Sequence, residues 1–197
     1  MTGSVPVPPP PPSIVGWIAA GVLDADLAAL VWLLAEGGVP VVVAGTPGSG
    51  RSALLGAVRE LAGAGSRPTM PSRLPEIVEA RSLEEVQAHL AESPLGAGED
   101  ELRGLGVVLV LEGAATGWRR VVAAHYVRPL ERDGQGHVQR RPPALLAAWD
   151  ATRLAFDDYA WGIVTELATR VGREPAEFDR ERARRAAHLA GLAATLH

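Results

Sequence analysis

A glycine-rich segment in the first third of the chain carries the residues best suited to bind a phosphate group. In a loop of the form G-x-x-x-x-G-K-[ST], successive backbone N–H groups surround an anion, and the dipole of the following helix adds favourable potential. The last serine or threonine of this pattern is a ligand for Mg²⁺. The sequence therefore predicts a site for ATP or ADP, with Mg²⁺ at Ser52, formed by Gly45, Thr46, Pro47, Gly48, Ser49, Gly50, Arg51 and Ser52.

Arg51 departs from this pattern because it stands where lysine is expected. Lysine is a compact and flexible charge, and the larger planar guanidinium cannot occupy the same point between two phosphates. All 19 basic residues of the chain are arginine, so compositional drift explains this arginine as well as a tuned site does. We expect phosphate binding to survive the change and hydrolysis to suffer from it.

Hydrolysis also needs a carboxylate at the end of a neighbouring strand, where it holds Mg²⁺ and positions water. Glu112 is the candidate, since it directly follows the apolar run 107–111. The alternative is that Glu112 merely opens a hairpin that leads to Arg119 and Arg120. Those two arginines are candidate phosphate sensors or plain surface residues.

The elements around the glycine-rich segment indicate an α/β fold. Asp24 or Asp26 can cap a helix that runs to Glu36, where two glycines end it. The valine-rich run 39–44 predicts a buried parallel strand, and apolar spacing predicts a helix over 52–62. Strand, glycine-rich loop and helix are the context that a phosphate-binding loop requires.

The rest of the chain predicts further helices and strands around one core. We expect residues 1–13 to form a proline-rich disordered tail and residues 14–197 one domain with a helical C-terminal portion over about 163–196. Beyond the loop we expect a helix over 82–91 capped by Ser82, strands over 106–111, 119–126, 145–149 and 155–159, and helices over 165–171 and 175–196.

Composition excludes several classes of function. The chain has no cysteine, which removes disulfides, thiol catalysis and cysteine zinc sites. Its net charge of −4 gives no support for binding nucleic acid. The apolar stretch 14–34 carries Asp24 and Asp26 near its middle, so we expect no membrane insertion, and without a basic leader we expect a cytoplasmic protein.

Several segments resemble the type II/IV secretion ATPases, the P-loop motors of secretion systems, Flp-type pili and archaeal flagella. The helix and strand over 27–45 look like those that precede the phosphate-binding loop in that family. Residues 117–122 look like its G-x-R-R-V element, and 148–156 with 185–189 look like its tail. The resemblance spans most of residues 24–192 and implies a small RecA-like P-loop domain with a central sheet flanked by helices.

The same resemblance marks what is missing. Family members carry an acidic box, a Walker B element and a His box after the loop, and only the end of the His box has a counterpart here, with Glu79 in the histidine position. By the same resemblance, we expect the N-terminal domain of the family to have no counterpart in this chain. The resemblance therefore implies a degenerate nucleotide-binding relative with weak or no ATP hydrolysis, which acts in secretion or pilus assembly as a homo-oligomer or with a true secretion ATPase. Two alternatives remain: a compact active NTPase or kinase that uses Glu112 as the Walker B acid, and a protein-interaction module with a vestigial loop.

Overall fold

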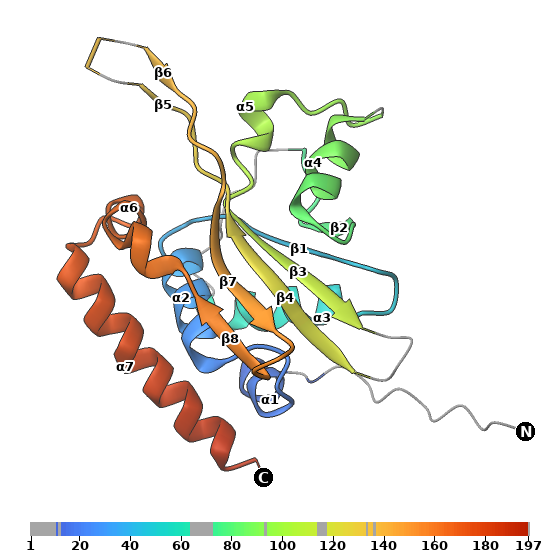
Figure 1. The fold of residues 1–197 in the computed structure, drawn as a ribbon, viewed down its shortest axis with the longest axis vertical. Helices are drawn as coiled ribbons and strands as arrows, with labels where there is room; N and C mark the ends of the chain where they lie inside the picture. Colours follow the sequence, from blue (N-terminus) through green and yellow to red (C-terminus); the bar gives the residue numbers. More distant parts are fainter. Residues whose placement is uncertain are drawn as a thin grey trace, which may run out of the picture.

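A mixed six-stranded sheet with helices on both faces forms the body of the protein (Figure 1). The computed structural model describes residues 11, 13–63, 73–92, 94–113, 118–132, 134–135 and 137–196. The strand order is β2-β1-β3-β4-β7-β8. The prediction of an α/β fold is thus confirmed, whereas most of the proline-rich tail lies outside the described residues.

The parallel half of the sheet carries the glycine-rich loop. Strand β1 (Val41–Gly45) lies between β2 (Ile77–Glu79) and β3 (Val107–Gly113), and it is parallel to both. Every residue of β1 is buried, as the continuous run of valine predicts for a strand covered on both faces. The predicted buried parallel strand is therefore confirmed, while the three-residue β2 was not predicted.

An antiparallel meander completes the sheet. Strand β4 (Arg119–Tyr126) pairs with β3, β7 (Ala144–Asp150) pairs with β4, and β8 (Ala155–Asp158) forms the outer edge. Between β4 and β7 the chain makes a small separate hairpin of β5 (Glu131–Arg132) and β6 (Val138–Gln139), which extends away from the body in Figure 1. The sheet is mixed, with its parallel ladder confined to three strands.

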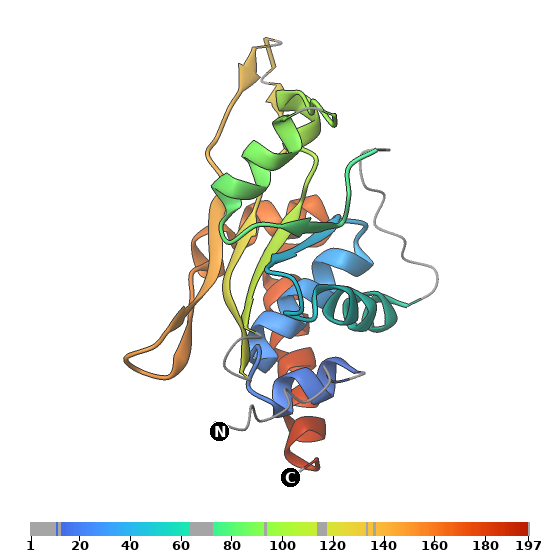
Figure 2. The same ribbon diagram turned by 90° about the vertical axis from the view of Figure 1, so that its right-hand side faces the viewer.

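Helices cover the two faces unequally, as Figure 2 shows. The larger layer consists of α1 (Ile14–Ala19), α2 (Ala25–Glu36), α3 (Arg51–Ala62) and α7 (Pro175–Ala194). The opposite face packs on α4 (Leu83–Ala91), next to the short α5 (Glu99–Leu102). A 3₁₀ turn, η1 (Ala160–Ile163), and α6 (Val164–Arg170) connect β8 to α7. No helix among the described residues is long and apolar enough to cross a membrane.

Side-chain caps set the helix starts that the sequence predicts. The Asp24 carboxylate accepts a hydrogen bond from the Leu27 amide at 2.8 Å, and Gly37 is the C-cap that follows α2. The Ser82 hydroxyl accepts from the Glu85 amide at 3.2 Å, and the Glu85 carboxylate accepts from the Arg81 amide at 2.7 Å. Each cap satisfies amides that a helix leaves unpaired at its start.

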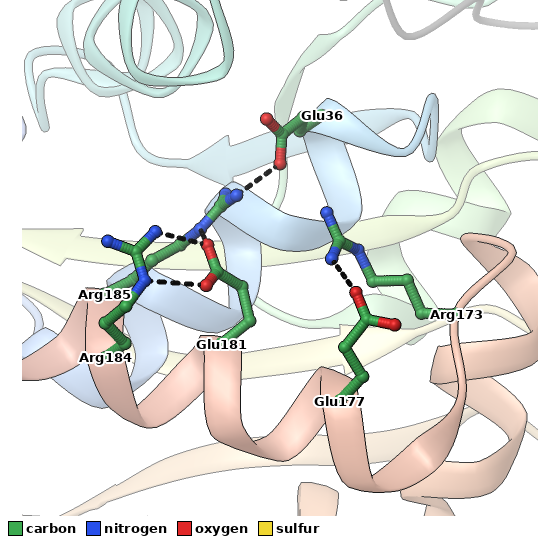
Figure 3. A network of polar contacts seen from close by, with 6 residues as sticks. All are labelled: Glu36, Arg173, Glu177, Glu181, Arg184 and Arg185. Atoms are coloured by element: carbon green, nitrogen blue, oxygen red, sulfur yellow. Dashed lines mark hydrogen bonds and ion pairs between the residues drawn. The ribbon is translucent and has the colours of Figure 1, made fainter.

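A buried arginine joins the last helix to α2 (Figure 3). The Arg185 side chain is 6% exposed; it donates to Glu181 at 2.7 Å within α7 and to Glu36 at 2.6 Å at the end of α2. Its guanidinium also lies over the Trp32 ring, 4.2 Å from the centroid. Because α2 leads directly into β1, this contact braces the strand that carries the glycine-rich loop.

Candidate phosphate-binding site

The glycine-rich loop connects the end of β1 to the start of α3. Gly48 (φ 79°) and Gly50 (φ 98°) both adopt left-handed backbone conformations, which side chains with a Cβ rarely tolerate. Gly50 is the N-cap of α3, and no side chain caps the helix there. The first amides of α3 are therefore left for an anion or for water.

Two further observations belong to the interior of the loop. Ser49 is fully buried, and its hydroxyl has no hydrogen-bond partner among the described residues. A Cβ atom on Gly45 would lie 2.4 Å from the Leu111 carbonyl oxygen and 2.8 Å from Ser49 Oγ, so only glycine fits at the end of β1. The loop is thus packed closely against β3, and Thr46 Oγ1 donates to the Gly113 carbonyl at 3.4 Å.

Arg51 has a structural contact that the sequence does not reveal. Its Nη1 donates to the Val78 carbonyl of β2 at 2.8 Å, so the guanidinium ties the start of α3 to the neighbouring strand. Ser52 is exposed in the first turn of α3. Its hydroxyl is therefore accessible to a Mg²⁺ ion that accompanies a phosphate.

Two carboxylates stand at the strand ends beside the loop. Leu111 pairs with Gly45 in the parallel ladder, and the exposed Glu112 follows it. The exposed Glu79 pairs directly with Gly45 from the other side. The sequence indicates Glu79 only as the residue in the histidine position of the family's His box. Its location beside the loop was not predicted, because β2 is too short to be recognised by its pattern.

These two acids lie on the two strands that flank β1. Successive side chains of a strand point to opposite faces. Leu111 packs in the cluster beneath α2 and α3, whereas Val78 packs in the cluster beneath α4. Glu79 therefore shares the face of the loop and α3, and Glu112 lies across from Arg120 in the antiparallel pairing, just after a register irregularity between β3 and β4.

The arginines expected to sense phosphate begin β4. The Arg120 guanidinium stacks on the Trp149 ring, 3.6 Å from the ring centroid. Burial lowers the pKa of Arg120. Arg119 pairs with Gly113 in the ladder, and Gly117 of the expected G-x-R-R-V element lies outside the described residues. Arg120 thus contacts β7, on the side of β4 away from the glycine-rich loop.

Among the histidines, His89 is exposed on α4. His125 is half-buried in β4, and burial lowers its pKa. No group of three potential metal-ligating His, Cys, Asp or Glu side chains exists in the described part of the chain. The uncapped start of α3 leaves backbone amides available to an anion, and the exposed Ser52 lies in the same first turn.

Comparison with protein-family models and with curated protein sequences finds no match to this chain.

Proposed function

We propose that this protein binds ATP or ADP through the loop 45–52 and hydrolyses ATP weakly or not at all. The observation that carries the proposal is the loop itself: it leaves the N-terminus of α3 without a side-chain cap, directly after a left-handed glycine and a buried, unpaired serine hydroxyl. Such an N-terminus presents several amide donors to one anion and favours negative charge. The position of Arg51 on the Val78 carbonyl supports weak turnover, since this cation is held by the protein backbone.

The biological setting in this proposal comes from the resemblance to type II/IV secretion ATPases. We propose a reduced RecA-like domain that acts in the cytoplasm, in secretion or pilus assembly, as a homo-oligomer or beside a complete ATPase. Three parallel strands with the loop at the end of the middle one support this reading of the fold. The missing acidic and Walker B elements support a role that does not depend on rapid hydrolysis.

Titration of the protein with ATP, ADP, AMP and adenosine tests whether phosphate carries the binding. Charge-assisted hydrogen bonds contribute about 1.5–3 kcal/mol each, so we expect ATP and ADP to bind at least about 100-fold more tightly than adenosine. Ser52→Ala should remove the enhancement by Mg²⁺ and leave metal-free ADP binding unchanged. Equal affinities for adenosine and ATP would overturn the proposal.

A second candidate function is a compact active NTPase or kinase, which the two carboxylates beside the loop favour. If Glu112 holds Mg²⁺ or positions water, Glu112→Gln keeps nucleotide binding and reduces turnover by about 100-fold or more. Glu79→Gln is the matched control because it removes the same charge from another exposed carboxylate at the loop. Equal turnover in wild type and Glu112→Gln would show that Glu112 does not take part in hydrolysis. A loss of turnover confined to Glu79→Gln would show that Glu79 is the acid that does.

A further inference from the structure

Glu79 lies beside the start of the glycine-rich loop, on the strand next to β1. It pairs with Gly45 in the parallel ladder, and Gly45 is the last residue of β1 before the loop. Neighbouring strands lie about 4.8 Å apart, so the backbone of Glu79 is one strand spacing from the loop. Glu112, on the other side of β1, is one residue beyond the partner of Gly45 and pairs with Arg120. Glu79 is therefore the carboxylate directly level with the start of the loop.

The chain neighbours of Glu79 indicate the face to which its side chain points. Successive side chains of a strand point to opposite faces. Ile77 packs against the cluster beneath α3, whereas Val78 and Ala80 pack in the cluster beneath α4. Glu79 therefore points to the same face as Ile77, and the first turn of α3 on that face carries the exposed Ser52.

Arg51 holds the backbone beside Glu79 against the same turn of α3. Its Nη1 donates to the carbonyl of Val78, the residue before Glu79, at 2.8 Å. The stem of Arg51 also passes close to the start of the loop, since a Cβ atom on Gly45 would lie 3.4 Å from Arg51 Cγ. Because Ser52 directly follows Arg51, this contact keeps the end of β2 close to the turn that carries the Ser52 hydroxyl.

The Glu79 carboxylate is available to a ligand. Its side chain is exposed, and it forms no hydrogen bond or ion pair within the described part of the chain. Mg²⁺ is usually bound by one or two carboxylates together with substrate phosphates, and it keeps several of its waters. One carboxylate and one hydroxyl beside a bound phosphate are therefore a sufficient contribution from the protein.

We propose that Glu79 acts with Ser52 on the Mg²⁺ ion of a bound nucleotide, and that Glu112 does not. The inference rests on the proposed binding of nucleotide by the loop 45–52. It assigns the acid of the site to β2, the short strand on the side of β1 opposite the apolar run that ends at Glu112. The pairing of Glu79 with Gly45 and the tie from Arg51 to Val78 are the observations that carry it.

Calorimetric titration with ADP, once with Mg²⁺ and once with EDTA, tests this assignment. The ratio of the two dissociation constants measures how much the ion strengthens nucleotide binding. We expect Glu79→Gln to lower this enhancement at least about tenfold, because Mg²⁺ prefers a charged oxygen ligand. Metal-free ADP should bind Glu79→Gln no more weakly than wild type, because the variant removes a negative charge near the phosphates.

Two further variants serve as controls. Glu112→Gln removes the same charge on the other side of β1 and should leave the enhancement by Mg²⁺ unchanged. Glu79→Asp keeps a carboxylate and should retain more of the enhancement than Glu79→Gln. A variant that failed to fold would lose metal-free ADP binding as well, so the two titrations separate loss of the ion from loss of the fold.

Three results would overturn the assignment. If ADP binds and the enhancement by Mg²⁺ is the same in wild type and Glu79→Gln, Glu79 does not act on the ion, and the nucleotide site itself stands. If Glu112→Gln lowers the enhancement as much as Glu79→Gln or more, the acid of the site is not Glu79 alone. If wild type binds ADP neither with Mg²⁺ nor with EDTA, the proposed nucleotide site fails and the assignment fails with it.

Discussion

Arg185→Ala is expected to lower the free energy of unfolding by about 3 kcal/mol, the cost of breaking a buried ion pair. The variant leaves Glu36 and Glu181 without their buried partner and removes the guanidinium from the Trp32 ring. Because α2 and α7 pack along each other through this contact, the loss should also loosen the element that precedes β1. Urea unfolding followed by circular dichroism measures the change.

Arg185→Met is the matched control for this prediction. Methionine keeps an unbranched apolar chain against Trp32 and brings no unpaired donor. In the wild type, Arg185 Nη1 is buried without a hydrogen-bond partner among the described residues, so the arginine itself is incompletely satisfied. We expect Arg185→Met to cost less than Arg185→Ala, because both variants leave Glu36 and Glu181 without Arg185 and only methionine keeps an apolar chain against Trp32. Equal stability of wild type and Arg185→Ala would show that the network does not brace the fold.

Acid should weaken the same network. Hydrogen bonds from Arg184 and then Arg185 hold the pKa of Glu181 at about 2, below its ordinary value of 4.5. A carboxylate whose pKa is lowered in the folded state contributes stability above its unfolded pKa and loses it as pH falls through the folded value. Wild type should therefore lose more stability than Arg185→Met between pH 4.5 and 2.

The sequence predicts the elements around the loop well because each has a local signal. Asp24 precedes an apolar pattern with helical period, and Gly37 follows it. These two residues predict the ends of α2 to within one residue. The valine run of β1 and the glycines of the loop predict the strand and the start of α3 in the same way. These signals depend on neighbours in the chain, so one sequence suffices to recognise them.

Features that depend on distant residues were not predictable in this way. Strand β2 is three residues long and forms because its backbone pairs with that of β1. The contact of Arg51 with Val78 and the position of Glu79 opposite Gly45 both follow from that pairing. The hydrogen bond from Arg128 to Glu166 joins segments that lie 38 residues apart. No local pattern marks any of these contacts.

A charge placed in the loop should decide whether phosphate binds there. Gly48 is exposed and left-handed (φ 79°), a conformation that aspartate and asparagine tolerate better than other residues with a Cβ. Gly48→Asp adds a carboxylate beside the expected phosphates, and Gly48→Asn adds a neutral group of the same shape. We expect the affinity for Mg²⁺-ATP to fall at least about tenfold further in Gly48→Asp than in Gly48→Asn, which is about 1.4 kcal/mol.

Titration calorimetry of wild type, Gly48→Asp and Gly48→Asn with Mg²⁺-ATP is the most direct test of nucleotide binding by this loop. Saturable binding in wild type, largely kept in Gly48→Asn and lost in Gly48→Asp, is the predicted result. Wild type that releases no heat of binding at millimolar ATP, or equal affinities in the two variants, would contradict it. The loop would then be a relic on a protein-interaction module, and protein partners would become the object of the search.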